Sequence, residues 1–252
     1  MTLVRYETRG PVSVLCIDRP ERKNAVDRAT AAALLEGYRR FEAADEQRVL
    51  VVSGSAEAFC AGADLKALDN DVERAEGPMG FTRLVSKKPA VAAIEGYCVA
   101  GGLEIALCCD LRVAGSSAKL GCLERRWGVP LIDGGTQRLP RVVGLGRALD
   151  LVLTGRLVDA AEAERIGLVD RVVPDGSALE RAVELGQAIS GFPWSCVLAD
   201  RDSLLEGLGR PLAEGLAIEA KRGTAVLVEA AEGAARFAAG AGRHGGQPGN
   251  DS

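Results

Sequence analysis

Two short segments rich in small residues are places where the backbone itself could take part in chemistry. They are residues 58–65, Ala-Phe-Cys-Ala-Gly-Ala-Asp-Leu, and residues 96–104, Gly-Tyr-Cys-Val-Ala-Gly-Gly-Leu-Glu. Small side chains leave backbone N–H groups uncovered, and a carbonyl held between two such donors is strongly polarised. Two carboxylates, Glu104 at the end of the second segment and Glu124 further along, could move protons beside that carbonyl.

Other kinds of catalysis find little support in the residue types. The single histidine, His244, lies in a glycine-rich C-terminal stretch, which disfavours Ser-His-Asp and Cys-His chemistry. The seven cysteines are scattered without a Cys-x-x-Cys pair, a pattern typical of reduced, buried, small apolar side chains. No cluster of histidine, cysteine and carboxylate has ligand spacing, so we expect no metal site. The stretch 144–147, Gly-Leu-Gly-Arg, lacks the third glycine of a dinucleotide fingerprint, so no nicotinamide cofactor is expected.

Alternating strands and helices must position these groups. Between two apolar runs, Asp27 is placed to cap a helix whose apolar positions recur at helical spacing. The Gly101-Gly102 pair then opens a second helix, with its free N–H groups at the start. The expected strands are 12–17, 49–52, 91–94 and 111–114, and the second helix is 101–109. This order predicts an α/β fold.

From about residue 145 onward the pattern becomes helical. The expected helices include 160–166, 178–189, 196–208 and 211–237. Pro211 suits the first turn of the last of these helices. Residues 240–252 are rich in glycine, and we expect them to be disordered.

The composition is that of an ordinary globular protein. With 252 residues, 47% of them hydrophobic and 26% charged, the chain can bury one core, with or without a small appendage. The net charge of −4 and the absence of long basic runs disfavour nucleic acid as a partner. No stretch approaches the ~18 apolar residues of a membrane span, and no targeting segment is present, so we expect no membrane partner and a cytoplasmic location.

The chain resembles the crotonase (enoyl-CoA hydratase/isomerase) superfamily. The resemblance covers residues 3–238 and rests on five segments that occur in the family's order: 17–25, 58–65, 96–104, 134–140 and 154–174. It implies a crotonase-like ββα spiral core with a helical C-terminal region. We therefore expect a core at 1–195, a helical oligomerisation region at 196–239 that assembles trimers or dimers of trimers, and the tail at 240–252.

The resemblance also implies roles for individual residues. It places the two carbonyl-binding donors, the oxyanion hole, at the N–H groups of Ala63 and Gly101. It identifies Glu104 and Glu124 as the two glutamates of hydratases, of which Glu104 would orient and activate water and Glu124 would protonate Cα. It also implies an acyl-CoA thioester as substrate, so coenzyme A is part of the substrate and no further cofactor is expected. The residues assigned to coenzyme A are Arg22, Lys23, Ala61, Asp64, Leu65 and Lys66.

The resulting prediction is an enoyl-CoA hydratase of fatty acid metabolism that adds water across a 2-enoyl-CoA double bond. Leu123 replaces the proline of typical hydratases, and the arginine at 125 would favour a charged Glu124 unless its side chain points away. Asp133 could supply a third carboxylate, although we expect it to cap the following helix. A sister reaction therefore stays open: isomerisation, decarboxylation, dehalogenation or thioester hydrolysis. A non-catalytic acyl-CoA binder is also an alternative, although binding alone requires neither glutamate.

Overall fold

The computed structural model describes residues 2–239. His244 and the predicted disordered tail at 240–252 lie outside the described residues. Within the described part of the chain, every helix is too short or too polar to span a membrane.

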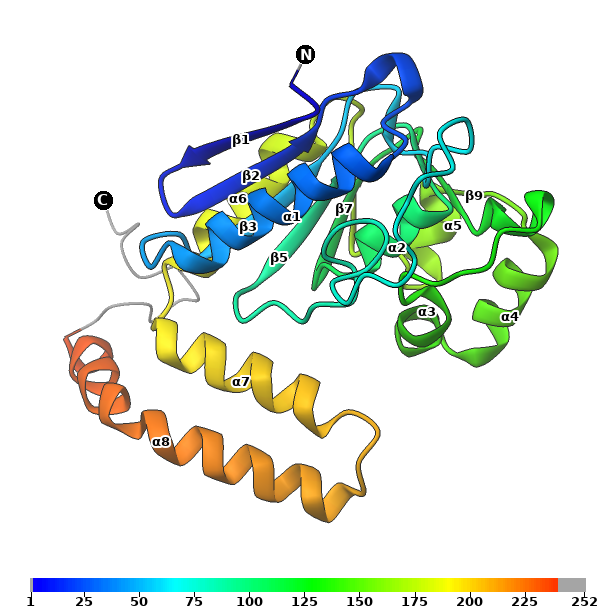
Figure 1. Ribbon diagram of the computed structural model, residues 1–252. Coiled ribbons are helices and arrows are strands. Elements are labelled where there is room, and N and C mark those ends of the chain that lie inside the picture. The colour runs from blue at the N-terminus through cyan, green and yellow to red at the C-terminus, as the bar shows by residue number, and fades with distance from the viewer. Residues whose placement is uncertain (1, 240–252) are drawn as a thin grey trace.

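A six-stranded sheet forms the centre of the molecule (Figure 1). Its strands, in spatial order, are β1 (Val4–Arg9), β2 (Val12–Ile17), β3 (Val49–Ser53), β5 (Ala90–Ile94), β7 (Leu111–Gly115) and β10 (Arg171–Val173). Only the β1–β2 pair is antiparallel; the other pairs are parallel. Strands β2, β3 and β5 are buried at every position, because a parallel sheet is covered on both faces. The four strands predicted from the sequence are confirmed, whereas β1 was not predicted.

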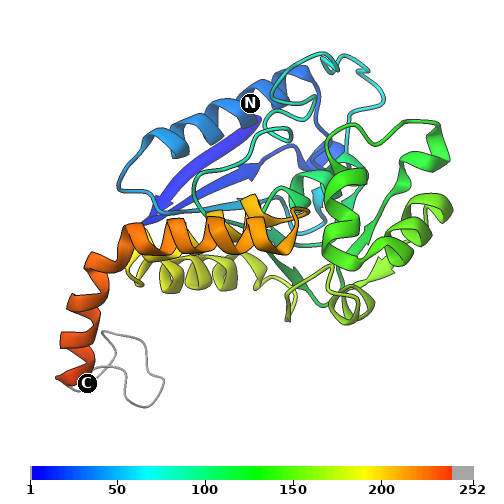
Figure 2. The same ribbon diagram turned by 90° about the horizontal axis from the view of Figure 1, so that it is seen from below.

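Helices cover the two faces of this sheet (Figures 1 and 2). Helix α1 (Arg28–Ala43) packs on the face that presents Leu15 and Leu50, and α6 (Ala178–Ser190) packs on the face that presents Val14 and Val51. The predicted cap of α1 is confirmed, since the Asp27 carboxylate accepts the Thr30 N–H at 2.8 Å. The alternation of side chains along each strand thus divides the core into two apolar clusters.

A second, four-stranded sheet follows directly from the first. It consists of β4 (Ala58–Cys60), β6 (Tyr97–Val99), β8 (Lys119–Gly121) and β9 (Val158–Asp159). Strands β3, β5 and β7 of the large sheet are each followed in the chain by one of these short strands, and β6 leads directly into α2 (Gly101–Leu107). This succession of two strands and a helix is the expected ββα arrangement. It brings the ends of the short strands together at one place.

The remaining short helices line one end of the core. They are the 3₁₀ helices η1 (Pro20–Arg22) and η2 (Leu123–Trp127), and the α-helices α3 (Gly135–Val143), α4 (Leu145–Thr154) and α5 (Ala160–Arg165). Helix α3 packs against both α2 and α4. The segments that flank α2 and α3 therefore meet beside the small sheet.

The last two helices form a hairpin that projects from the core (Figure 1). They are α7 (Trp194–Gly207) and α8 (Leu212–Ala238), which pack against each other. The two helices predicted here are confirmed, with α7 starting two residues earlier than expected and Pro211 preceding α8 as its N-cap.

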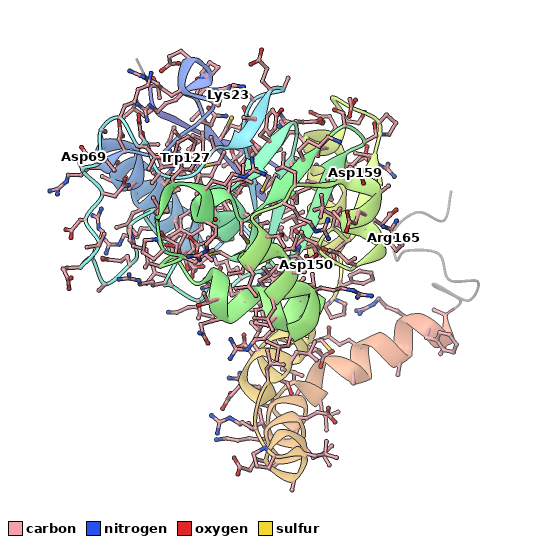
Figure 3. The ribbon with its side chains drawn as sticks, turned by 90° about the vertical axis from the view of Figure 1, so that its right-hand side faces the viewer. Lys23, Asp69, Trp127, Asp150, Asp159 and Arg165 are labelled. Carbon is pink, nitrogen blue, oxygen red and sulfur yellow. The ribbon has the colours of Figure 1, made fainter. Side chains whose placement is uncertain are left out.

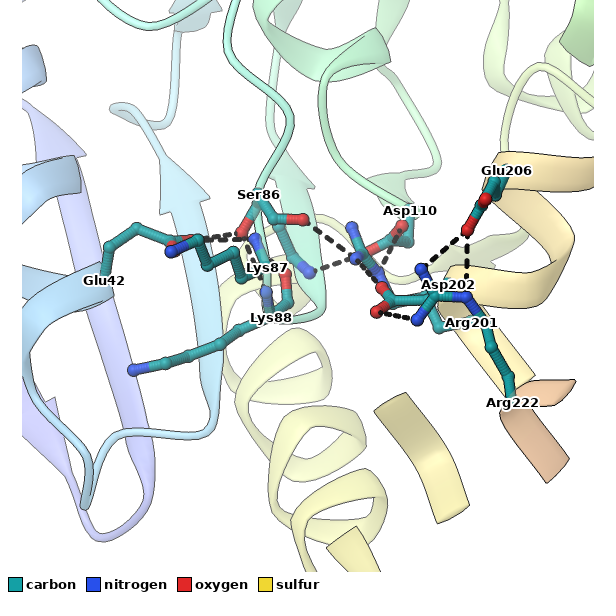
Figure 4. A network of polar contacts seen from close by, with 10 residues as sticks. Glu42, Ser86, Lys87, Lys88, Asp110, Arg201, Asp202, Glu206 and Arg222 are labelled. Atoms are coloured by element: carbon teal, nitrogen blue, oxygen red, sulfur yellow. Dashed lines mark hydrogen bonds and ion pairs between the residues drawn. The ribbon is translucent and has the colours of Figure 1, made fainter. Parts of the chain in front are cut away.

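An ionic network attaches this hairpin to the core (Figure 4). Arg201 of α7 donates to the Asp110 carboxylate at 3.0 Å and to the Ser86 carbonyl oxygen at 2.9 Å. Within the hairpin, Arg222 of α8 contacts Asp202 at 3.0 Å and Glu206 at 2.7 Å. Arg201 thus links the hairpin to the core, as does Arg48, whose guanidinium group lies 5.4 Å from the centre of the Trp194 ring of α7. Arg222 links the two helices of the hairpin.

Candidate active site

A cavity of about 270 Å³ lies where the small sheet, the start of α2 and the segment around η2 meet. Most of its lining is apolar. The cavity brings together residues that are far apart in the sequence, among them Ala61, Ala63, Gly101, Glu104, Glu124 and Asp133. Both predicted backbone donors and both predicted glutamates therefore border one space.

The two glycine-rich segments approach each other closely at this cavity. A side chain on Gly62 would place its Cβ 3.0 Å from the Gly101 nitrogen and 2.8 Å from the Ala100 Cβ, so only glycine fits there. Among residues 2–239, the N–H groups of Ala63 and Gly101 have no hydrogen-bond acceptor. Gly101 is the first residue of α2, where helix geometry leaves N–H groups free. Ala100 just before it has φ of +54°, a strained conformation for alanine that aims the helix start into the cavity.

The carboxylate of Glu104 is held by two backbone N–H groups of the segment that leads into α3. Its side chain lies in α2, and the residue is only 2% exposed. One carboxylate oxygen, Oε1, accepts the Asp133 N–H at 3.0 Å and the Gly135 N–H at 2.7 Å. Burial raises the pKa of Glu104 to about 8; the bond from Gly135 lowers it, while the charges of Asp133 and Glu124 raise it. The group can therefore exchange a proton near neutral pH.

Glu124 is buried without any hydrogen-bond partner. It lies in η2, is 4% exposed, and neither carboxylate oxygen has a partner among the described residues. Burial raises its pKa to about 7. Arg125 and Arg126 donate to the carbonyl oxygens of Val152 and Gly155 instead. The charge of Arg125 does lower the pKa of Glu124, as the sequence suggested, but burial has the larger effect and the net shift is upward.

Asp133 does not cap a helix, so that prediction is also wrong. The N-cap of α3 is Gly134, with φ of +101° and no side-chain cap. The Asp133 carboxylate instead accepts the Met79 N–H at 3.1 Å and the Thr82 hydroxyl group. Burial raises the pKa of Asp133, while these two hydrogen bonds lower it. These partners lie more than fifty residues away in the chain, and no local signal identified them.

The residues assigned to coenzyme A fall into two groups. Ala61 and Leu65 line the cavity beside Ala63. Asp64 is buried; its carboxylate contacts Arg19 at 3.3 Å and accepts the Lys66 N–H at 3.0 Å. This carboxylate therefore holds the loop that follows β4.

The three basic candidates lie outside the cavity lining. Arg22 and Lys66 are exposed, and the Lys23 ammonium group lies 5.2 Å from the centre of the Tyr97 ring. Figure 3 shows Lys23 at the top of the view, above Trp127. Contact of these three side chains with coenzyme A stays a prediction.

The cavity has an apolar rim that the residue patterns did not identify as part of the site. Trp127 of η2 and Leu68 both line the rim. Trp127 is 71% exposed, and Leu68 is also exposed and has φ of +47°. The loop 70–80 contributes Asn70, Val72, Pro78 and Met79 to the lining.

The cysteines have no chemistry at this site. Burial raises the pKa of Cys60 and of Cys122 to about 12, which disfavours the thiolate that a nucleophile requires. All seven thiols are free, and five are buried as expected; Cys108 is partly exposed and Cys196 is exposed, so the expectation of buried cysteines is wrong at these two positions. Within residues 2–239, no group of histidine, cysteine and carboxylate side chains has the arrangement of a metal site.

Comparison with known proteins gives a consistent result. The sequence model of the enoyl-CoA hydratase/isomerase family matches residues 7–239. A probable enoyl-CoA hydratase of Rhizobium meliloti is 38% identical over 84% of this chain and 85% of its own length. The enoyl-CoA hydratase EchA19 of Mycobacterium tuberculosis is 36% identical over 92% of each chain. Among solved structures, an enoyl-CoA hydratase of Mycobacterium tuberculosis has a TM-score of 0.89 at 34% identity, covering 94% of this chain and 95% of that chain.

Proposed function

The chain belongs to the enoyl-CoA hydratase/isomerase family and has its crotonase fold, and from this premise we propose that it hydrates a 2-enoyl-CoA thioester. The observation that carries the proposal is the pair of buried glutamates with raised pKa values, facing the same cavity as two free backbone N–H groups. Addition of water to a conjugated double bond needs both features.

The thioester carbonyl would lie between the N–H groups of Ala63 and Gly101. As water adds to Cβ, negative charge develops on the carbonyl oxygen, and the two donors stabilise it. Gly101 is fixed in advance by the start of α2 and Ala63 by its bridge to Val26, so the two donors need no reorganisation during the reaction. One such donor generally contributes about 3 kcal/mol to transition-state stabilisation.

The two glutamates would then move the protons. Glu104 takes a proton from water as the oxygen bonds to Cβ, and Glu124 gives a proton to Cα of the resulting enolate. One proton must return from Glu104 to Glu124 between turnovers. Both pKa values are raised, so the pair retains a proton near neutral pH.

The location of that shared proton follows from hydrogen bonding. Taken singly, the pKa values of about 8 and about 7 place it on Glu104. The two N–H donors at Glu104 favour the charge there, whereas no donor within residues 2–239 contacts the Glu124 carboxylate. N–H donors stabilise a carboxylate directly, so the charge lies on Glu104 and the shared proton on Glu124. This assigns the base role to Glu104 and the acid role to Glu124.

The test is a spectrophotometric assay with crotonyl-CoA and longer 2-enoyl-CoA thioesters. Hydration removes the conjugated double bond, so the absorbance of the enoyl thioester should fall with time. When the reaction is run in D₂O, the 3-hydroxyacyl product should carry deuterium at Cα. Failure to hydrate any 2-enoyl-CoA would overturn the proposal.

Double-bond isomerisation is the second candidate, because Asp133 adds a third carboxylate to the cavity. An isomerase moves one proton between Cγ and Cα and needs a single base. Incubation of a 3-enoyl-CoA with the enzyme would then give the 2-enoyl isomer without any 3-hydroxyacyl product. Product analysis by chromatography separates the two reactions.

A further inference from the structure

Asp133 is a buried carboxylate of the cavity for which hydration provides no role. The residue is 4% exposed and borders the cavity, yet the proposed proton transfers use only Glu104 and Glu124. A buried carboxylate in an apolar pocket destabilises a protein unless its oxygens are satisfied. Its surroundings therefore show what it can bind.

One of the two carboxylate oxygens of Asp133 accepts two hydrogen bonds from the loop that contains Met79 and Thr82. Oδ1 accepts both the Met79 N–H and the Thr82 hydroxyl. Gly77, with φ of +107°, lets the loop pass at close range: a Cβ there would lie 2.2 Å from the Thr82 oxygen and 3.3 Å from Oδ1. These contacts fix the orientation of the carboxylate.

The other oxygen, Oδ2, has no partner among the described residues. Among the described residues, the side-chain atoms that are both fully enclosed and without a hydrogen-bond partner are Ser53 Oγ, both oxygens of Glu124 and Ser195 Oγ. Asp133 Oδ2 does not belong to this set, so it is not fully enclosed. Oδ2 thus keeps accessible surface, and the cavity is the space that Asp133 borders.

Within residues 2–239, no basic side chain forms an ion pair with Oδ2, although the charges of Arg83 and Arg138 lower the pKa of Asp133. Arg83 donates to the Ile132 carbonyl oxygen at 3.1 Å, and Arg138 donates to the backbone oxygen of Asp133 at 3.1 Å. The carboxylate therefore presents one oriented, unoccupied hydrogen-bond acceptor to whatever fills the cavity.

An acyl chain that covers Oδ2 must either supply a donor or leave the acceptor unsatisfied. A site built to hydrogen-bond a substrate hydroxyl rejects the analogue that lacks it, because the buried polar group is then unpaired. We propose that Asp133 is a specificity-determining residue that selects acyl groups carrying a hydroxyl group able to donate to Oδ2. The inference rests on the proposed function in that it concerns the same acyl-CoA pocket.

The position of Asp133 restricts where that hydroxyl lies. The backbone N–H of Asp133 donates to Glu104 Oε1, the carboxylate assigned to the water that adds at Cβ. The side chain of the same residue therefore lies close to the reacting carbons. The hydroxyl belongs on the acyl carbons that directly follow Cβ.

The experiment measures binding of saturated acyl-CoA thioesters, which cannot be hydrated. Isothermal titration would compare 5-hydroxypentanoyl-CoA with hexanoyl-CoA, and 4-hydroxypentanoyl-CoA with 4-methylpentanoyl-CoA, so that a hydroxyl replaces a methyl group in each pair. For at least one pair, the hydroxylated thioester should bind about ten- to a hundredfold more tightly. The Asp133→Ala variant should lose this preference.

A matched control separates specificity from loop structure. Thr82→Val removes a hydrogen bond to Oδ1 while leaving Oδ2 in place, so it should keep the preference even if both ligands bind more weakly. Equal affinities in the wild type, or an unchanged preference in Asp133→Ala, would overturn the inference. Since no water is added in this assay, its outcome is independent of whether the enzyme hydrates enoyl-CoA.

Discussion

At the scale of single residues, the site depends on backbone N–H groups whose removal can be tested directly. Gly101 is the first residue of α2, a position that tolerates proline, and proline has no N–H. Gly101→Pro should lower kcat by about 10²-fold or more, because one carbonyl donor is lost.

The control for this variant is Gly101→Ala, which keeps the N–H. Its added Cβ would meet only the flexible end of Met79, at 3.0 Å, so most of the turnover should survive. Circular dichroism must show that both variants are folded. Near-normal turnover in a folded Gly101→Pro protein would mean that the carbonyl binds elsewhere.

The two glutamates allow a test of the acid and base roles. Glu104→Gln keeps an oxygen that can accept the Asp133 and Gly135 N–H groups, so the fold should survive. Glu104→Gln and Glu124→Gln should each lower kcat by roughly 10²-fold or more, with little change in KM. The double variant should lose far less than the product of the two effects, because the pair acts as a unit. Strong dependence on only one glutamate would indicate the isomerase.

The same two carboxyls predict how stability depends on pH. Burial raises the pKa of Glu104 to about 8 and that of Glu124 to about 7, from an ordinary value of 4.5. Between pH 4.5 and about pH 8, the folded protein keeps protons on these two carboxyl groups that the unfolded chain releases. The free energy of unfolding should therefore fall as pH rises through this range. The stabilisation is complete below about pH 4.5 and lost above about pH 8.

Urea unfolding between about pH 5 and pH 8 measures this slope. The double variant Glu104→Gln, Glu124→Gln cannot ionise at these positions and should show a much flatter dependence. Glu73→Gln, which changes an exposed carboxyl group, is the matched control and should leave the slope unchanged. An identical slope in the wild type and the double variant would refute the burial argument.

At the scale of elements, Arg201 is a principal ionic contact between the α7–α8 hairpin and the core. Its side chain is 12% exposed and bridges α7 to Asp110 and to the Ser86 carbonyl oxygen, as Figure 4 shows. Arg201→Met should lower the free energy of unfolding by about 1–3 kcal/mol and expose the segment before α7 to proteolysis, because charged acceptors lose their donor.

Arg222→Met is the comparison for the hairpin. Arg222 joins only residues of the hairpin and is more than a third exposed, so its loss should change the free energy of unfolding by less than about 1 kcal/mol. Urea unfolding and limited proteolysis of both variants give the answer. Equal effects of the two substitutions would mean that the ionic link does not attach the hairpin.

At the scale of the whole molecule, apolar side chains remain uncovered on the hairpin. Leu204 and Leu212 are 76% and 78% exposed, and a groove of about 630 Å³ lies between the hairpin leucines and the core. A surface of this kind is typical of a subunit interface. We therefore expect homotrimers or dimers of trimers.

Light scattering tests this expectation against the subunit mass of 26.3 kDa. The mass should be three or six times that value, and Leu204→Asp combined with Leu208→Asp should shift it towards the monomer. A wild-type protein that scatters as a monomer at all concentrations would exclude the assembly. The hairpin would then be an appendage of a single subunit.

The sequence by itself determined the large parallel strands and the elements that carry the site. Strands β2, β3, β5 and β7 are almost entirely buried, so they are mainly apolar runs, interrupted only by Ser13 in β2 and Arg112 in β7 and followed by Ser53 at the end of β3, and they can be recognised without their partners. The Asp27 cap and the Gly101 helix start are local features, set by residues within one turn. The family likewise follows from ordered motifs.

The tertiary structure alone decided the features that depend on distant partners. The short strands of the small sheet, at most three residues each, are too brief to show a period, and β1 is defined by pairing with β2. Asp133 was misassigned because its partners Met79 and Thr82 come from a remote loop. The pKa values of Glu104 and Glu124 are raised by burial, and burial is a property of the packed molecule that no local spacing contains.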